Sequence, residues 1–386
     1  MNSPTRFKLL VTAATLSLAA VVTTFPGHAQ GEGAKNSIGE RRESKRLFIK
    51  ETFGGNGRTC LTCHSLETGT VSPEEAQWRF AVDPYDPLFI HDGSDDGHGN
   101  GVSRMLKDAT VRVEIPLHPD VSVADDPYAR SVVLTRGIPS TLNTPSLDPV
   151  LMLDGRHSDL REQALGAIRD HAQNTVEPSD KELQRLAEFE QSEFFFSSHA
   201  LRRFARTGKA PELPEGRTES EKRGRLFFID VPFTSPSQKA GSCAACHSGP
   251  MLNETNQFLP LPGVPAGTRF LSAGVSERNI AKNPVRQFIF KNADGSSTTL
   301  PPSPDPGRAL ITGEAGGFTN FNAFKISSLW GVRRTAPYFH DNSAKTLADV
   351  AAHYAEFFKA ISNPKDPLIL TPQDQADIVA YLRLLD

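Results

Sequence analysis

Four cysteines form two copies of one short pattern, and each copy could hold a redox cofactor. The first copy reads Cys60-Leu61-Thr62-Cys63-His64 and the second reads Cys243-Ala244-Ala245-Cys246-His247. The spacing C-x-x-C-H is the attachment signature of c-type haem, in which two thiols bind the macrocycle and the histidine binds the iron. Two copies that both keep the histidine, and together use every cysteine, favour haem over disulfides or a zinc site. The sequence therefore predicts two covalently bound haem c groups, with His64 and His247 as iron ligands.

The segments around the motifs predict how the motifs are positioned. Arg46-Leu47-Phe48-Ile49 precedes the first motif and Arg225-Leu226-Phe227-Phe228 precedes the second, each at the end of a helix-like stretch. Thr371-Pro372-Gln373-Asp374 has the composition of a helix start, and Ile378, Tyr381, Leu382 and Leu385 then form one apolar face. A helix, a haem loop and later closing helices are typical of a cytochrome c module. We therefore expect a mainly α fold of two cytochrome c-like haem domains with long loops.

A change in composition separates the two modules. Residues 197–216 are rich in Pro, Gly and charged side chains, which favours a boundary there. We expect an N-terminal haem domain at residues 38–200 and a C-terminal haem domain at residues 215–386. Residues 80–146 and 251–317 are rich in Pro, Gly and Asp, and we expect ordered loops packed around the haems.

Residues 1–29 have the pattern of a secretory signal peptide. Arg6 and Lys8 precede an apolar run from Leu9 to Val22, and Ala29 ends a small-residue cleavage site. An uncleaved anchor is the alternative, but the run is shorter than the ~20 residues needed to cross a bilayer. We expect a periplasmic mature protein without a membrane span. Loss of the two cations changes its formal net charge from −3 to −5, which argues against nucleic acid as a partner.

These features together resemble the bacterial di-haem cytochrome c peroxidase superfamily, which includes the peroxidases, the haem enzymes that mature methylamine dehydrogenase, and the rubber oxygenases. The similarity runs from about Lys45 to the C-terminus. Besides both C-x-x-C-H motifs, it rests on Ile138-Pro139-Ser140-Thr141-Leu142-Asn143, on Asp154-Gly155-Arg156 followed by Leu160 and Gln163-Ala164-Leu165-Gly166, and on Thr335-Ala336-Pro337-Tyr338-Phe339-His340-Asp341. The resemblance implies that the N-terminal haem meets the oxidant, and that a six-coordinate C-terminal haem takes in or relays electrons.

The resemblance also implies a sixth ligand for the C-terminal haem. Counting along the chain after Asp341 places Tyr354 at this position, where the peroxidases have Met and the methylamine dehydrogenase maturation enzymes have Tyr. A phenolate oxygen favours Fe(III) and lowers the potential, whereas a thioether raises it. Two alternatives stay open. Tyr354 is a core aromatic beside Val350 and Phe357, or His353 is the ligand on a rotated helix.

Two departures from the family pattern affect the chemistry expected at the N-terminal haem, and the first concerns a proton carrier. The peroxidases place a Gln and then a Glu at its open face, and the carboxylate moves protons during peroxide cleavage. Gln163 keeps the first position, but Gln173 occupies the second, and an amide cannot exchange protons at neutral pH. His171 is the candidate replacement and Glu177 a more distant one, although a lone helical histidine is more often a surface or packing residue.

The second departure is Leu153, where the family has a tryptophan between the two haems. Leucine has no accessible redox state, so electrons would pass by tunnelling or through another aromatic, such as Trp330 or Tyr338. The rubber oxygenases also lack the carboxylate and act on O₂, but they are longer than this chain.

Three further features are weaker. The peroxidases bind calcium through an Asn and through carbonyls equivalent to those of Thr335 and Pro337. The Asn position here is Gly137, so a calcium site would depend on these carbonyls and on water. The segment from Asp92 to Gly97 resembles the start of a calcium loop, yet Ser103 stands at the twelfth position, and a surface loop is favoured. Met105 and His118 are candidates for the ligand that occupies the N-terminal iron before activation, with core packing the alternative for Met105.

The sequence thus favours a periplasmic di-haem c-type oxidoreductase, with H₂O₂ or O₂ reacting at the N-terminal haem beside Gln163, His171 and Gln173. Electrons would pass through the C-terminal haem, held by His247 and Tyr354. The expected partner is a small electron-donor protein, such as a cytochrome c or a cupredoxin, or an oxidisable substrate. The alternatives are a non-enzymatic di-haem electron carrier and an O₂-dependent oxygenase of the same superfamily.

Overall fold

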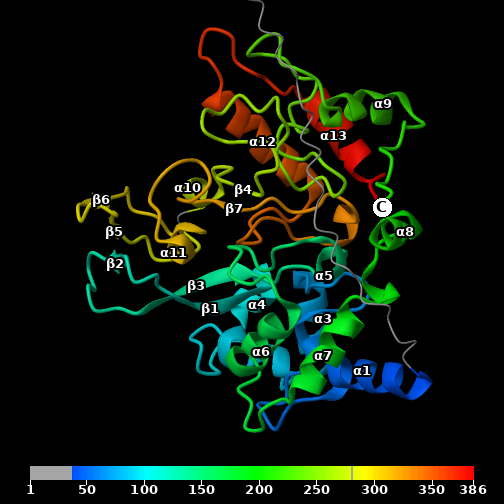
Figure 1. The fold of residues 1–386 in the computed structure, drawn as a ribbon, viewed down its shortest axis with the longest axis vertical. Helices are drawn as coiled ribbons and strands as arrows, with labels where there is room; N and C mark the ends of the chain where they lie inside the picture. The colour runs from blue at the N-terminus through cyan, green and yellow to red at the C-terminus, as the bar shows by residue number, and fades with distance from the viewer. Residues whose placement is uncertain (1–36, 280) are drawn as a thin grey trace, which may run out of the picture.

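The computed structural model describes residues 37–279 and 281–386. Figure 1 shows two helical regions stacked along the long axis, with short strands between them on one side. The helices of the N-terminal region are α1 (Ile38–Lys50), α2 (Cys60–Cys63), α3 (Pro73–Val82), α4 (Ser103–Asp108), α5 (Thr144–Leu147), α6 (Leu160–Asp170) and α7 (Asp180–Glu190), with 3-10 turns η1 (Pro87–Phe89), η2 (His91–Gly93) and η3 (Glu193–Phe195). The C-terminal region has α8 (His199–Thr207), α9 (Glu219–Arg225), η4 (Leu226–Phe228), α10 (Val275–Arg278), α11 (Ala309–Thr312), η5 (Val332–Arg334), α12 (Leu347–Ile361) and α13 (Pro372–Leu382).

Each region is built on a pair of packed helices that flank its C-x-x-C-H segment. In the N-terminal region α1 packs on α7, and the rings of Phe48 and Phe189 lie 5.3 Å apart between centroids. In the C-terminal region α9 packs on α13, and the rings of Phe228 and Tyr381 lie at the same separation, 5.3 Å. The repeat expected from the sequence is therefore visible as two similar helix pairs, each with a buried aromatic contact next to a cysteine loop.

The predicted start of the last helix is confirmed. Thr371 caps α13 with a hydrogen bond from the amide of Asp374, in a reciprocal capping box, and Pro372 is the first helical residue. The predicted apolar face is buried in the C-terminal core, with Tyr381 and Leu385 fully inaccessible. Helix α13 thereby contributes one side of the hydrophobic core of the C-terminal region.

Short strands occupy parts of the two stretches that were expected to be loops, which corrects that expectation. Strand β1 (Thr110–Pro116) pairs antiparallel with β3 (Ser131–Gly137), with Val113 opposite Leu134. Strand β2 (Val121–Val123) pairs with β5 (Phe288–Lys291), which pairs with β6 (Ser297–Thr299), and β4 (Phe270–Leu271) pairs with β7 (Phe324–Lys325). The mainly α expectation holds with these small sheets added, and the β2–β5 pairing joins the two halves of the chain.

The residues expected to separate the domains are partly helical. Helix α8 lies inside the 197–216 range, and its Leu201 is fully buried in the core of the C-terminal region. The proposed signal peptide, residues 1–29, lies outside the described residues. In the described part of the chain, no helix has the length and apolar character to cross a membrane.

Candidate haem sites

The two C-x-x-C-H segments share one local geometry. The amide of His64 donates to the carbonyl of Cys60 (3.0 Å), and the amide of His247 donates to the carbonyl of Cys243 (2.9 Å). The ring Nδ1 of His64 donates to the carbonyl of Gly69 (2.8 Å), and that of His247 to the carbonyl of Leu252 (2.9 Å). A carbonyl can only accept, so Nδ1 carries the proton and Nε2 is left as the ligand atom. Metal-binding histidines are oriented in this way by a hydrogen bond from the second ring nitrogen.

All four cysteines are free thiols at the edges of these sites. Burial raises the pKa of Cys243 and of Cys246 to about 12, and it also raises the pKa values of Cys60 and Cys63. The thiols are therefore protonated at neutral pH. Within residues 37–279 and 281–386, no group of three or more His, Cys, Asp or Glu side chains is arranged to hold a metal ion.

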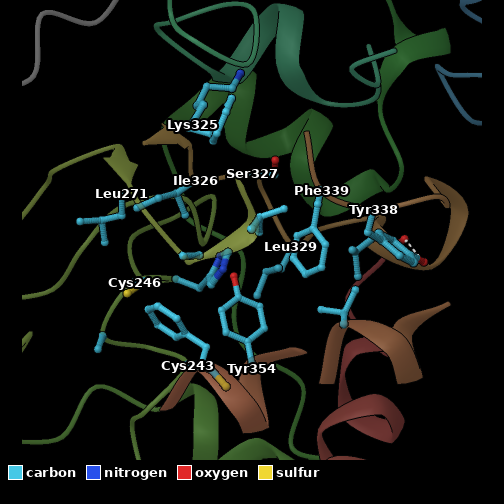
Figure 2. Close-up of a pocket in the computed structure, with 18 of the residues that line it drawn as sticks. Cys243, Cys246, Leu271, Lys325, Ile326, Ser327, Leu329, Tyr338, Phe339 and Tyr354 are labelled. Carbon is cyan, nitrogen blue, oxygen red and sulfur yellow. Dashed lines mark hydrogen bonds between the residues drawn. The ribbon is translucent and has the colours of Figure 1, made fainter. Parts of the chain in front are cut away.

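A large cavity of about 750 Å³ lies over the C-terminal motif. Cys243, Cys246 and His247 line one side, and Tyr354 of α12 lines it as well. Figure 2 shows the phenol of Tyr354 extending from its helix, with the hydroxyl oxygen directed into the space among the labelled residues. The volume lies within the ~300–1,000 Å³ of typical cofactor pockets, and the remaining lining is mostly apolar, including Ile326, Leu329 and Phe339. The residues present fit a covalently attached macrocycle.

The structure separates the two candidate sixth ligands. Tyr354 lines the cavity, and its hydroxyl has no hydrogen bond to any residue that the structure describes. Burial raises its pKa, and the nearby thiols of Cys246 and Cys243 add to this effect. His353 instead places Nε2 2.8 Å from the carbonyl of Ala273 and does not line the cavity. Tyr354 is therefore the side chain available to a metal ion on this wall.

A smaller cavity of about 130 Å³ lies beside the N-terminal motif. Cys63 and His64 line it, and Gln163 and His171, from α6 and its C-cap, line it as well. One cysteine and the histidine of the motif line this cavity, whereas both cysteines line the C-terminal one, and the volume is below that of typical cofactor pockets. The lining segments would have to separate for a macrocycle of the same size to enter.

His171 is held by a buried ion-pair network. Its Nδ1 lies 2.5 Å from Oδ2 of Asp92, and Asp92 also accepts a hydrogen bond from the guanidinium of Arg58. Asp92 and Arg58 are both buried, with side chains 6% and 2% exposed. Burial raises the pKa of Asp92, but the hydrogen bonds and charges of His171 and Arg58 outweigh this, so the pKa is lower than usual. Asp92 is therefore an ionised partner for the imidazole at neutral pH.

Gln173 is not brought into this cavity. It adopts a left-handed backbone conformation (φ 52°), and its side chain accepts a hydrogen bond from Asn56 (3.1 Å) at the surface. Glu177 is also outside, because its exposed carboxylate pairs with Arg169 (3.0 Å). Of the three residues proposed for the N-terminal reaction site, the structure places Gln163 and His171 together and leaves Gln173 away from them.

The two cavities share a wall. The residues that line both come from the end of β3, from the loop after β3 up to the start of α5, from the position before the D-G-R segment and from β7, namely Gly137, Ile138, Pro139, Ser140, Thr144, Leu153 and Lys325. Leu153 thus lies between the two sites, at the position where the family has its tryptophan. Trp330 and Tyr338 line the C-terminal cavity alone. In the described part of the chain, no aromatic side chain lines both cavities.

Three residues near the N-terminal cavity were missed by the sequence analysis. Asp92 was treated as part of a surface loop, yet only Asp95 and Asp96 fit that description, because their carboxylates accept hydrogen bonds from the loop itself. Arg58 stands two residues before Cys60, and this proximity was a usable signal. Glu190 is a buried carboxyl that lines the cavity, and burial raises its pKa to about 8. In the sequence, the one sign of this burial is that Glu190 falls on the apolar face of an amphipathic helix.

The remaining candidates lie away from both cavities. Met105 is fully buried in an apolar cluster with Leu88 and Phe89. His118 pairs with Asp120 near Gly313 and lines neither cavity. At the family's calcium-binding Asn position, the space beside Gly137 is filled by the side chain of Asn342, which a Cβ at residue 137 would approach to 2.2 Å.

Comparisons with known proteins agree on one superfamily. No protein-family model matches the chain. It is 27% identical over 159 residues to the cytochrome-c peroxidase IdrP1 of Denitromonas iodatirespirans, covering 39% of this chain and 38% of that protein. It is 25% identical over 226 residues to the cytochrome c551 peroxidase of Nitrosomonas europaea, covering 54% of this chain and 55% of that protein. The chain thus spans about a third to about half of the length of these curated relatives.

A solved structure shares the fold over almost the whole chain. It is the crystal structure of a MauG-like protein associated with microbial copper homeostasis, with 18% identity, a TM-score of 0.51, and coverage of 91% of this chain and 90% of that one. The expected resemblance to the di-haem cytochrome c peroxidase superfamily is confirmed by these relatives and by this fold.

Proposed function

We propose that this chain is a periplasmic di-haem c-type oxidoreductase of peroxidase type, with one haem at each C-x-x-C-H motif. The observation that carries the proposal is a difference between the two cavities. The C-terminal cavity holds a phenol, Tyr354, on the wall that faces the cysteine motif. The N-terminal cavity has no phenol among its described lining residues and is lined instead by Gln163 and His171 of the α6 segment, with Met152 and His157 before that helix. The first arrangement suits a six-coordinate electron-transfer haem and the second an open reaction site.

The residues that would hold the haems are those of the two motifs. Cys60 and Cys63 would attach the N-terminal group and Cys243 and Cys246 the C-terminal group, with Nε2 of His64 and of His247 as ligand atoms. When bound, the haems supply an iron that binds the oxidant and electrons that reduce it. Burial raises the pKa of Tyr354, whereas a metal cation facing its hydroxyl would lower that pKa and favour the phenolate.

The protein contributes orientation and proton transfer at the N-terminal site. Gln163 can hold a bound oxygen ligand by a hydrogen bond from its amide. His171 can accept a proton at Nε2, because its Nδ1 is committed to Asp92. We propose H₂O₂ as the oxidant, with O₂ as the alternative, and a small redox protein or an oxidisable substrate as the source of electrons. The peroxidase names of the curated relatives support the choice of peroxide.

Peroxide turnover by the purified protein tests this proposal. The haem content is measured first by the alkaline pyridine spectrum, for which we expect two c-type haems per chain. Reduced cytochrome c is then mixed with peroxide and catalytic amounts of the protein, and its oxidation is followed. Two haems with no turnover, and no spectral response to peroxide, would instead support the non-enzymatic electron carrier. Turnover with O₂ alone would support the oxygenase alternative.

A further inference from the structure

A buried carboxylate is hydrogen-bonded to the imidazole of His171, which lines the N-terminal cavity. Asp92 lies in η2, is 5% exposed, and places Oδ2 2.5 Å from Nδ1 of His171. We propose that Asp92 is a positioning residue that fixes the tautomer of His171 and stabilises its charged form, so that the Asp92–His171 pair is the proton-transfer group of this cavity. The inference rests on the proposed oxidant chemistry at that site.

The tautomer follows from the hydrogen bond. An ionised carboxylate has no proton to donate, so Nδ1 of His171 must carry the hydrogen, and Nε2 of the neutral ring is then an acceptor. A histidine held in this way by a carboxylate becomes a better base, because the carboxylate stabilises the imidazolium that forms. Without Asp92 either nitrogen could carry the proton and the ring could turn.

Arg58 anchors the carboxylate to the cysteine loop. Its guanidinium donates to Asp92, to the carbonyl of Pro87 (2.7 Å) and to the carbonyl of Ile90 (2.6 Å). Arg58 also donates to the carbonyl of His171 (3.3 Å). Because Arg58 stands two residues before Cys60, the network connects the haem-attachment segment to His171. The guanidinium binds Oδ1 of Asp92, so Oδ2 accepts the hydrogen bond from the imidazole.

The backbone around Asp92 is shaped to bring it inward. His91 adopts a left-handed conformation (φ 47°), which costs a non-glycine residue about 1 kcal/mol. Gly93 leaves no room for a side chain, since a Cβ there would lie 1.9 Å from the carbonyl oxygen of Leu88 and 2.7 Å from Nη2 of Arg58. An ordinary surface loop would need neither feature.

The proton balance of the proposed step is closed. Nε2 of His171 takes one proton from hydrogen peroxide and returns it to the oxygen that leaves as water when the O–O bond breaks. His171 therefore gains and loses one proton. The other oxygen takes up two electrons from the external donor and two protons from solvent and leaves as the second water, so that one H₂O₂, two electrons and two protons give two waters. Asp92 stays ionised throughout and stabilises the imidazolium between the two transfers.

Other charged groups also surround His171 and would contribute to any pH dependence. They are Arg58 before α2, His64 after α2, Asp170 at the end of α6, His91 and Asp92 in η2, Arg136 in β3, Arg156 and His157 before α6, Glu190 at the end of α7, and Lys325 in β7. The variants must therefore change Asp92 or His171 alone, with a control at a similar ion pair outside the cavity.

The test measures cyanide binding to the haem-loaded protein as a function of pH, because HCN must lose its proton to bind iron as cyanide. We expect Asp92→Asn to slow cyanide association by about 10–100-fold at neutral pH, and to move the midpoint of the pH profile to lower pH, since the imidazolium loses its carboxylate. His171→Ala should slow association by about 10²-fold or more. Peroxide turnover should fall in the same order.

The matched control is Asp86→Asn. Asp86 forms a two-point pair with Arg79 (2.6 and 2.9 Å) beside the same cysteine loop, and it lines neither cavity. Its loss should leave the cyanide rate and the pH profile unchanged. If Asp92→Asn does not yield folded protein, Asp92→Glu keeps the charge for Arg58 but displaces the carboxylate, and we expect slower association and a shifted profile.

The outcomes separate this inference from the proposed function. Wild-type rates and pH profiles in the folded Asp92 variant would overturn the role of Asp92 while leaving the peroxidase proposal intact. A loss of rate at Asp92 with an unmoved pH profile would indicate a structural role only, and it would also overturn the inference. If the wild-type protein binds neither cyanide nor peroxide, the proposed function fails and the inference fails with it.

Discussion

Leu153 lies in the wall between the two cavities, and its carbonyl accepts a hydrogen bond from the amide of Lys325 (2.8 Å). Lys325 lines the same wall and pairs with Asp148 (2.7 Å) with its side chain 8% exposed. The wall shared by the two cavities therefore contains an aliphatic side chain and a buried ion pair. Neither group can be oxidised at the potentials of haem proteins, so the two sites are expected to exchange electrons slowly.

Replacing Leu153 by tryptophan should restore a redox-active group to this wall. We expect faster electron transfer between the two haems in Leu153→Trp, at a cost in stability of about 1–3 kcal/mol from overpacking. Rapid mixing of the reduced protein with peroxide, followed at wavelengths that distinguish the haems, measures the rate. Leu151→Trp is the control, because Leu151 lies in the same segment and lines the N-terminal cavity alone, whereas the half-buried Leu153 lines both cavities. Equal rates in both variants and the wild type would show that Leu153 does not limit the transfer.

Removing the hydroxyl of Tyr354 should remove one ligand from the C-terminal haem. In Tyr354→Phe we expect loss of the low-spin spectrum of that haem and a raised reduction potential, because the phenolate favours Fe(III). Tyr338→Phe is the control: its hydroxyl lines the same cavity but donates to the carbonyl of Val332 (3.0 Å), as the dashed line in Figure 2 marks. A low-spin spectrum that survives in Tyr354→Phe would rule out this ligand.

The carboxyl of Glu190 should make stability fall as pH rises. Burial raises its pKa to about 8, above the ordinary value of 4.5. The unfolded chain therefore ionises first, and the free energy of unfolding declines between about pH 4.5 and 8 and then levels. In the wild type this decline amounts to roughly 3–5 kcal/mol in the free energy of unfolding, and we expect Glu190→Gln to abolish it. Urea unfolding at pH 5 and pH 9 checks it, with Glu188→Gln, two residues earlier on α7, as the control. Parallel pH dependence in wild type and Glu190→Gln would contradict the prediction.

Asp377 should contribute stability with the opposite sign. Its hydrogen bonds from Arg223, Ser220 and Gln373 hold its pKa at about 2, below the ordinary 3.8. The contribution is present above pH 3.8 and is lost as pH falls through about 2. Asp377→Asn should lower the free energy of unfolding by about 1.5–3 kcal/mol at neutral pH, since α9 and α13 lose a shared anchor. The surface change Asp125→Asn should have no such effect, and an equal loss in both would refute the account.

The sequence predicted the parts of this molecule that depend on local pattern. The C-x-x-C-H motifs, the capped start of α13 and its apolar face depend on residues close together in the chain, so spacing was sufficient. The β2–β5 pairing was not predicted, because it joins Val121–Val123 to residues far along the chain, and three-residue strands carry little alternation.

The candidate site was predicted in part for the same reason. Counting along one helix placed Gln163 and His171 near each other, and both line the same cavity, whereas the left-handed turn after α6 directs Gln173 to Asn56. The pairing of Asp92 with His171 depends on two segments that the fold brings together. The burial of one aspartate in a loop rich in Gly and Asp cannot be read from the local sequence.

Electron paramagnetic resonance of the oxidised protein, recorded with and without cyanide, tests the central claim most directly. The account predicts one high-spin iron at the His64 site and one low-spin iron at the site of His247 and Tyr354, with cyanide converting the high-spin signal alone. Two low-spin irons that do not bind cyanide, in either the oxidised or the half-reduced protein, would contradict an open N-terminal site. That result would support the non-enzymatic electron carrier.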